Sequence, residues 1–160
     1  MWLFLLVVFS ICLGVTNVEG ACPHLESGLQ RWSDGNTWGG TKPTLNTKVV
    51  ISGKNILLDE PPPPLTGIEI QDGGALIWDN KEGITLTTDH VLVYGRFIIG
   101  SEDCKFTKKA NIVLTGLTND STSVGGYGRK FIGVGSGGTI EIHGEDKLSW
   151  TKLARTIPAS

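Results

Sequence analysis

The chain has 160 residues, of which 39% are hydrophobic and 19% charged, and its formal net charge at pH 7 is −2. A charge so close to zero excludes proteins that bind nucleic acid or an acidic membrane through bulk charge. This length suits one ordinary domain with a sizeable core and leaves no room for a second domain.

The first element is an almost wholly apolar run over residues 1–15, which polar residues follow directly. It is shorter than the roughly 20 apolar residues that a membrane span needs, and small residues fit a peptidase cut before Ala21. We therefore expect residues 1–20 to be a signal peptide and residues 21–160 to be one secreted, extracellular β domain. The alternative for the run is a buried core helix. Without Glu19, the chain keeps 14 basic residues against 15 acidic ones and a net charge of −1.

Export has two consequences for single residues. Cys12 leaves with the signal peptide, so Cys22 and Cys104 remain, and a disulfide is the default for such a pair in an oxidising compartment. Two free thiols are the alternative. Asn119 begins an Asn-Asp-Ser acceptor for N-glycosylation in a polar stretch flanked by glycines, which predicts an exposed glycan-bearing loop.

The rest of the chain is dominated by strand signals. Short runs rich in Ile, Val, Leu and Thr alternate apolar and polar residues, and Gly, Pro, Asn or Asp interrupts them. This pattern predicts an all-β fold with strands at residues 48–51, 56–59, 67–70, 75–79, 84–87, 90–94, 96–99, 111–115, 130–134 and 139–143. It predicts no amphipathic helix.

Three of these segments form an internal repeat, at residues 49–58, 68–78 and 132–142. Each reads as an apolar-x-apolar strand, a polar turn with glycine and a second alternating strand. The first two copies start nineteen residues apart, close to one coil of a parallel β-solenoid, which favours stacked rungs. Consecutive hairpins in a β-sandwich meander are the alternative. Residues 61–64 are four prolines, which predict a stiff, extended surface crossing.

No motif selects a catalytic residue, a cofactor or a metal. Residues 133–138 satisfy G-x-G-x-x-G, but a strand rather than a helix follows them, so we interpret these glycines as turn and close-packing positions. The histidines, His24, His90 and His143, lack metal-ligand spacing; His90 and His143, at strand ends, are predicted to be hydrogen-bonded structural residues. Because no spacing selects a nucleophile or a pair of carboxylates either, we lean against enzymatic activity for this chain alone.

Two kinds of side chain favour binding of an anionic polysaccharide: lysines clustered beside Cys104, and tryptophans whose flat faces suit sugar rings. Trp78 alternates with Leu76 in a predicted strand and is predicted to be in the core instead. The alternative for the lysines is that they only keep a loop soluble. The candidate contacts are Lys105, Lys108, Lys109, Trp32 and Trp38.

Several ordered motifs resemble one known family. The matching tracts are residues 32–40 (WSDGNTWGG), Pro43, and residues 49–51, 68–76, 111–116 and 132–138. They resemble the G-eight domain, which is named for its eight glycines. Residues 140–151 and the Cys22-Pro23 pair look specifically like the group of cell migration-inducing and hyaluronan-binding proteins.

The resemblance implies an extracellular β-rich domain at the N-terminus of a much larger protein, in a family associated with hyaluronan binding and depolymerisation. The implied partners are hyaluronan or another anionic glycosaminoglycan, and downstream domains of a longer protein. Relatives continue into further domains, including a longer β-helix, so no catalytic residue is carried over to this chain. We therefore expect a module that binds or positions the polysaccharide. The alternative is a purely structural cap or a protein-interaction module. The resemblance also supports the disulfide and the solenoid.

Overall fold

A computed structural model describes residues 22–116, 123–148 and 150–151. The predicted signal peptide and Asn119 lie outside these residues. Within them, no helix is long and apolar enough to cross a membrane.

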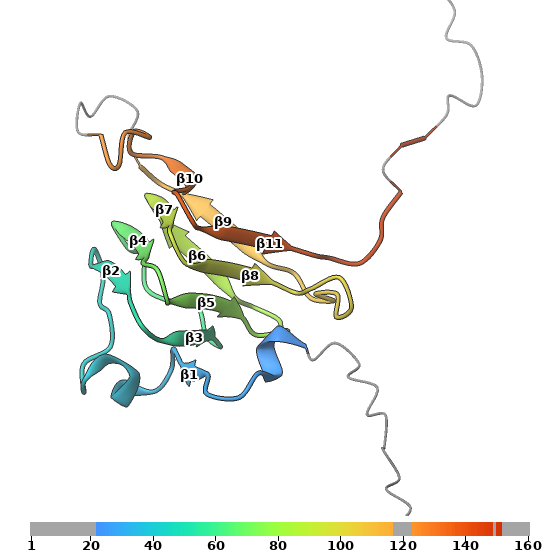
Figure 1. Ribbon diagram of the computed structural model, residues 1–160, viewed down its shortest axis with the longest axis horizontal. Helices are drawn as coiled ribbons and strands as arrows, with labels where there is room; N and C mark the ends of the chain where they lie inside the picture. Colours follow the sequence, from blue (N-terminus) through green and yellow to red (C-terminus); the bar gives the residue numbers. More distant parts are fainter. Residues whose placement is uncertain (1–21, 117–122, 149, 152–160) are drawn as a thin grey trace, which may run out of the picture.

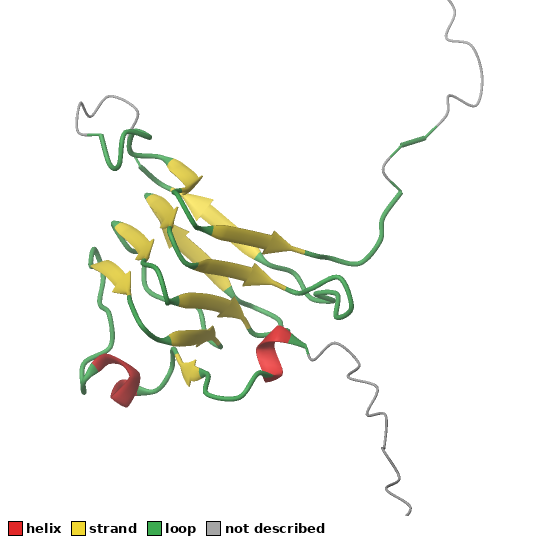
Figure 2. Cartoon of the chain, in the orientation of Figure 1, coloured by secondary structure: helices red, strands yellow, loops and turns green. Residues whose placement is uncertain are grey.

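The described residues form short strands and two 3-10 turns (Figures 1 and 2). All ten predicted strands are present, each within one residue of its predicted bounds. The sequence pattern missed the two-residue strand β1 and both 3-10 turns. In chain order the elements are η1 (Pro23–Leu25), β1 (Gln30–Arg31), η2 (Gly35–Trp38), β2 (Lys48–Ile51), β3 (Asn55–Leu58), β4 (Gly67–Ile70), β5 (Ala75–Trp78), β6 (Thr85–Thr88), β7 (His90–Val93), β8 (Arg96–Ile99), β9 (Asn111–Leu114), β10 (Phe131–Val134) and β11 (Thr139–Ile142).

The strands pair in parallel in three sheets. Sheet A has the order β1-β3-β5-β8-β11, sheet B the order β10-β7-β4-β2, and sheet C consists of β6 and β9. The chain passes from sheet B to sheet A and then to the side of sheet C before the next coil begins. Four rungs result: β2-β3, β4-β5-β6, β7-β8-β9 and β10-β11 (Figure 1). The prediction of stacked parallel rungs is confirmed, and the sandwich alternative is wrong.

The core lies inside the coil because every second residue of each strand points inward. In sheet B the register aligns Val49, Ile68, Val91 and Ile132 in one row across the four rungs. The prediction that Trp78 is a core residue is confirmed, since it belongs to this buried cluster.

Glycines at the corner between sheets B and A allow the rungs to stack closely. A Cβ atom at Gly74 would lie 2.7 Å from the carbonyl oxygen of Ile51, and one at Gly138 would lie 2.1 Å from that of Val93. By contrast, Gly137 meets no atom within 4 Å but has φ +80°, a conformation that other residues adopt with strain. The corner therefore needs glycine for two separate reasons, and both contribute to the glycine punctuation of the sequence.

The outer face of sheet A is also buried, because the segment that includes η1 and Leu29 lies against it. Leu57, Ile77 and Ile98 point outward, yet they form a second apolar cluster with Leu29 packed against it. A strand that is buried on both faces carries apolar residues at consecutive positions, as β5 does. The Cys22–Cys104 disulfide fastens this covering segment to the loop after β8, which confirms the predicted pairing.

The N-terminal end of the coil is capped by the residues that follow β1. The rings of Trp32 and Trp38 lie 4.7 Å apart edge to face, and the Trp38 indole N–H donates to the Trp32 carbonyl oxygen. The buried Asp59 carboxylate accepts hydrogen bonds from the backbone and hydroxyl of Ser33 and from Arg31. Burial acts to raise the pKa of Asp59, but these hydrogen bonds outweigh it and hold the pKa below its usual value.

Among the residues that the structure describes, none covers the opposite end of the coil. Residues of the fourth rung that occupy inward positions remain exposed, with 40% of Ile132, 43% of Val134 and 59% of Ile142 accessible to solvent. The equivalent residues of the inner rungs are almost completely buried. The two ends of the solenoid therefore differ, one covered by tryptophans and the other presenting bare apolar side chains.

The third side of the coil is built differently in each rung. In the first rung the four prolines cross this side without regular secondary structure, and Leu65 then makes a parallel bridge to Thr88. The predicted extended crossing is present, although Pro62 in its middle is buried. Strands β6 and β9 form this side in the second and third rungs. Among the described residues of the fourth rung, no strand follows on this side.

Candidate functional site

A groove of about 760 Å³ lies where the fourth rung lacks a third side. Its floor is apolar, and its walls include residues of the loop after β8, of β9 and of the segment after β11. Charged side chains line the groove in addition to the apolar ones. The apolar lining residues include Ile99, Phe106, Ala110, Ile112 and Ile142, and the charged ones are Glu82, Lys108, Lys109, Glu145 and Lys147.

The loop between β8 and β9 carries Lys108 and Lys109, and its backbone is held in place by a disulfide and by a hydrogen bond to the segment after β11. The Cys22–Cys104 disulfide anchors this loop, and the Phe106 backbone N–H donates to the His143 carbonyl oxygen over 2.7 Å. A parallel bridge between Phe106 and Gly144 continues this pairing. It brings the loop alongside the segment after β11, so that Lys108, Lys109 and Lys147 line one groove.

The groove carries three positive and two negative charges. Lys147 forms an exposed ion pair with Glu145, whose oxygen lies 2.7 Å from the ammonium nitrogen. The hydrogen bond from Lys147 lowers the pKa of Glu145 most, and the charges of Lys147 and Lys108 lower it further. Lys108 and Lys109 make no ion pair with other described residues. These two ammonium groups are therefore available to an anionic ligand.

The structure brings together only part of the predicted polysaccharide site. Lys108 and Lys109 line the groove, whereas Lys105 is not among its lining residues. Sequence reasoning missed Lys147, because only the bridge between the two loops brings it to the same groove. Lys147 could have been found only from the pairing of Phe106 with Gly144, which the sequence pattern does not reveal.

The predicted tryptophan contacts lie at the capped end of the coil, away from this groove. The prediction for Trp32 is wrong, since only 1% of the side chain is exposed and no ring face is left for a sugar. Trp38 lines a second hollow of about 330 Å³ together with Lys42 and Lys48. Its ring is already engaged, with the Lys54 ammonium nitrogen 5.1 Å from the ring centre. Trp38 therefore stays a candidate contact that is separate from the groove.

His90 is a buried structural residue, but not in the predicted way. Its ring stacks on Phe131 at 5.3 Å and lies over Gly67, where a Cβ atom would come within 2.3 Å of the ring. Its Nε2 atom has no hydrogen-bond partner among the described residues, so the predicted hydrogen-bonded imidazole is wrong at this atom. Burial lowers the pKa of His90, and the charge of Lys48 adds to this effect. The ring packs as a neutral aromatic group.

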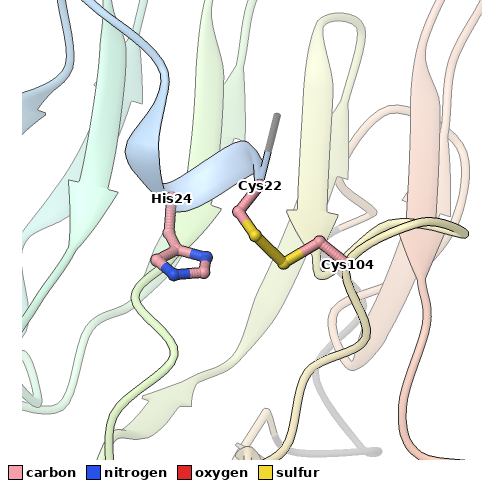
Figure 3. Close-up of side chains that lie close together, drawn as sticks. All are labelled: Cys22, His24 and Cys104. Atoms are coloured by element: carbon pink, nitrogen blue, oxygen red, sulfur yellow. A yellow bond between two sulfur atoms is a disulfide. The ribbon is translucent and has the colours of Figure 1, made fainter. Parts of the chain in front are cut away.

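Cys22, His24 and Cys104 lie close enough together for a metal site, with their ligand atoms within 4.8 Å of one another (Figure 3). The two sulfur atoms are bonded to each other at 2.03 Å. A disulfide offers no thiolate to a metal ion. We therefore interpret this group as a structural cross-link beside an imidazole.

Comparisons with known proteins agree on one family. The family model of the G8 domain matches residues 37–154. The chain is 39% identical to the "Cell surface hyaluronidase" of Danio rerio, with 99% of this chain and 12% of that protein aligned. It is 35% identical to the human "Cell migration-inducing and hyaluronan-binding protein", over 89% of this chain and 10% of that protein. Human "Fibrocystin-L" is 36% identical over 82% of this chain and 3% of its own length. The chain thus spans a small fraction of the relatives that it matches.

Proposed function

Since the chain belongs to the G8 domain family, we propose that it is an extracellular module that binds hyaluronan, or a closely related anionic glycosaminoglycan, in the groove beside β9. The names of two relatives, a hyaluronidase and a hyaluronan-binding protein, support this ligand class. Secretion, a cut before Ala21 and glycosylation of Asn119 fit the same proposal and stay predictions.

The observation that carries the proposal is a lysine rim above an apolar floor. Lys108, Lys109 and Lys147 line the same groove as the apolar side chains of Ile112 and Ile142. Hyaluronan carries a carboxylate on every second sugar, and its sugar rings and N-acetyl methyl groups provide apolar faces. Ammonium groups on the rim match the carboxylates, and the floor matches the ring faces.

The groove is better suited to binding than to cleavage. Glycoside hydrolysis needs one carboxyl group whose raised pKa keeps it protonated as a general acid. Glu145 has the opposite property, because Lys147 lowers its pKa. A lowered pKa favours the ionised carboxylate, which is not the protonated form that a general acid needs. We therefore propose a role in holding or positioning the polymer.

Removal of the two unpaired lysines should weaken hyaluronan binding. We expect Lys108→Gln/Lys109→Gln to weaken binding of a hyaluronan oligosaccharide about fivefold to tenfold at low salt, because exposed ion pairs each contribute about 0.2–1 kcal/mol. The difference should shrink at high salt, where exposed charges are screened. Isothermal titration calorimetry at two salt concentrations measures both effects.

Lys130→Gln is the matched control, because Lys130 is also exposed but is not among the residues that line the groove. We expect this control to bind within twofold of the unchanged protein. Equal losses in the control and in the double variant would contradict a groove-specific site. Absence of binding by the unchanged protein at low salt would contradict the proposal altogether.

A second candidate function is docking to a further β-rung of a longer protein. The open end favours it, because β10 and β11 are edge strands and leave Ile132 and Val134 bare. The isolated chain should then associate through this end in sedimentation experiments, and Val134→Lys should suppress the association. Val50→Lys, on the exposed outer face of the first rung, should not. A monodisperse chain at all concentrations would count against this function.

A further inference from the structure

The fourth rung is the only described rung whose third side is missing. Leu65, β6 and β9 occupy that side in the first three rungs. In the fourth, the groove lies next to β9, which is an edge strand of sheet C. Its floor includes Ile112 from β9 and Ile142 from β11, both at inward positions of their strands. The groove therefore has the place and the apolar lining that a missing third side would fill.

The spacing of the second rung indicates which residues fit this place. Trp78 and Ile142 end equivalent strands, since β5 and β11 both pair with β8 in one register. Six and eight residues after Trp78 come Ile84 and Leu86, which are completely buried on the third side of the coil.

The same spacing in the fourth rung leads to two large apolar residues. Six and eight residues after Ile142 come Leu148 and Trp150. They are 96% and 68% exposed, and the chain leads away from the sheets after β11 (Figure 1). Two positions that are core in the second rung are thus occupied by apolar side chains that lie outside the core in the fourth.

The segment that carries these residues already begins at the groove. Gly144, Glu145 and Lys147 line it, and the bridge from Gly144 to Phe106 fixes where the segment starts. Leu148 follows Lys147 directly, so a change in a few backbone torsions is enough to reach the floor. Burial of a leucine and a tryptophan against Ile112 and Ile142 removes apolar surface of both partners from water.

We propose that Leu148 and Trp150 dock into the groove as the third side of the fourth rung. The segment that carries these two residues, here called the strap, then competes with polysaccharide for the apolar floor of the groove. The docked state closes the coil, whereas the groove is open when Leu148 and Trp150 are exposed, as they are in the structure. The competition rests on the proposed function of the groove, whereas the docking itself does not. The affinity of the groove for the polymer therefore depends on whether the strap is docked.

Site-specific fluorine NMR tests the docking. The protein is labelled with 5-fluorotryptophan, and the Trp150 signal is assigned with Trp150→Phe. We expect a small H₂O/D₂O isotope shift for Trp150, as for a buried ring, and a large shift after Leu148→Ser. A fully solvent-exposed Trp150 signal in the unchanged protein would overturn the strap.

Binding of a hyaluronan oligosaccharide tests the competition. Leu148→Ser/Trp150→Ser should raise the affinity about twofold or more, because the apparent affinity scales with the open fraction and a strap that is closed half of the time withholds half of the sites. Leu45→Ser, which changes another exposed leucine, should leave the affinity unchanged. Unaltered affinity in the strap variant, with a buried Trp150 in the unchanged protein, would overturn the competition.

The two readouts separate the two proposals. If no variant binds hyaluronan but Trp150 is buried, the proposed polysaccharide function fails and the docking stands. If the unchanged protein binds hyaluronan and Trp150 is solvent-exposed, the docking fails and the function stands. Both Leu148 and Trp150 are exposed in the structure, so their replacement by serine is not expected to unfold the domain.

Discussion

Replacing Gly138 by alanine is expected to lower the free energy of unfolding by about 3 kcal/mol. The added Cβ atom would lie 2.1 Å from the carbonyl oxygen of Val93 in the rung below. That oxygen accepts the Gly135 N–H over 2.8 Å, so it cannot move without loss of a backbone hydrogen bond. The fourth rung must then shift as a unit, and such overpacking costs about 1–3 kcal/mol or more. Urea denaturation followed by circular dichroism measures the change.

Its neighbour in the same turn provides the control. Gly137 has φ +80°, and no atom lies within 4 Å of the place that a Cβ atom would take, so Gly137→Ala carries conformational strain without a clash. We expect a loss of about 1–2 kcal/mol there. If the two alanine variants lose the same stability, close stacking of the rungs at this corner does not explain the need for glycine at Gly138.

Removal of the disulfide is expected to have the largest effect on stability. Cys22 and Cys104 are 82 residues apart in the sequence, and the chain-entropy model gives about 4.5 kcal/mol for a cross-link of this length. Cys22→Ala/Cys104→Ala should also loosen the segment that covers the outer face of sheet A. We expect a lower urea midpoint and faster amide hydrogen exchange in β5 and β8, whose outer side chains this segment covers.

Leu25→Ser is a suitable control for the disulfide variant, because Leu25 lies in the same segment but is 72% exposed. Its urea midpoint should match that of the unchanged protein. Chemical reduction of the unchanged protein should reproduce the effect of the double alanine variant. Equal midpoints for the oxidised and the reduced protein would show that the cross-link contributes nothing to stability.

The alternation of apolar residues was enough to predict the ten longer strands, but not the third rung of the repeat or the segment that covers sheet A. The third rung, which contains β7 and β8, escaped the repeat pattern because only Tyr94 and Gly95 separate its strands, a shorter turn than in the other copies. The covering of sheet A was missed because residues 22–29 have no periodicity of their own. Burial on both faces instead makes β5 uniformly apolar, which alternation alone does not explain.

The candidate site was predicted in part for a similar reason. Lys108 and Lys109 were identifiable because they are neighbours in the sequence, whereas Lys147 joins them only through the bridge between Phe106 and Gly144. Trp32 was misassigned because a tryptophan in a glycine-rich turn has the same local pattern whether it caps a core or faces a ligand. Which of the two it does depends on the rung that lies beneath it.

The unequal corners of the coil determine where this scaffold tolerates change. Between sheets B and A the connections are short in all four rungs, and a closely packed glycine, Gly74, Gly95 or Gly138, fixes them in the second, third and fourth rungs. At the other two corners the connections vary widely: one residue separates β6 from β7, but sixteen separate β9 from β10. The strands nevertheless keep a single register. Because the entropy cost of a longer loop grows only slowly with its length, these corners accept insertions without moving a strand. New surface loops can therefore be added at these two corners, while the short corner between sheets B and A keeps the strands in register.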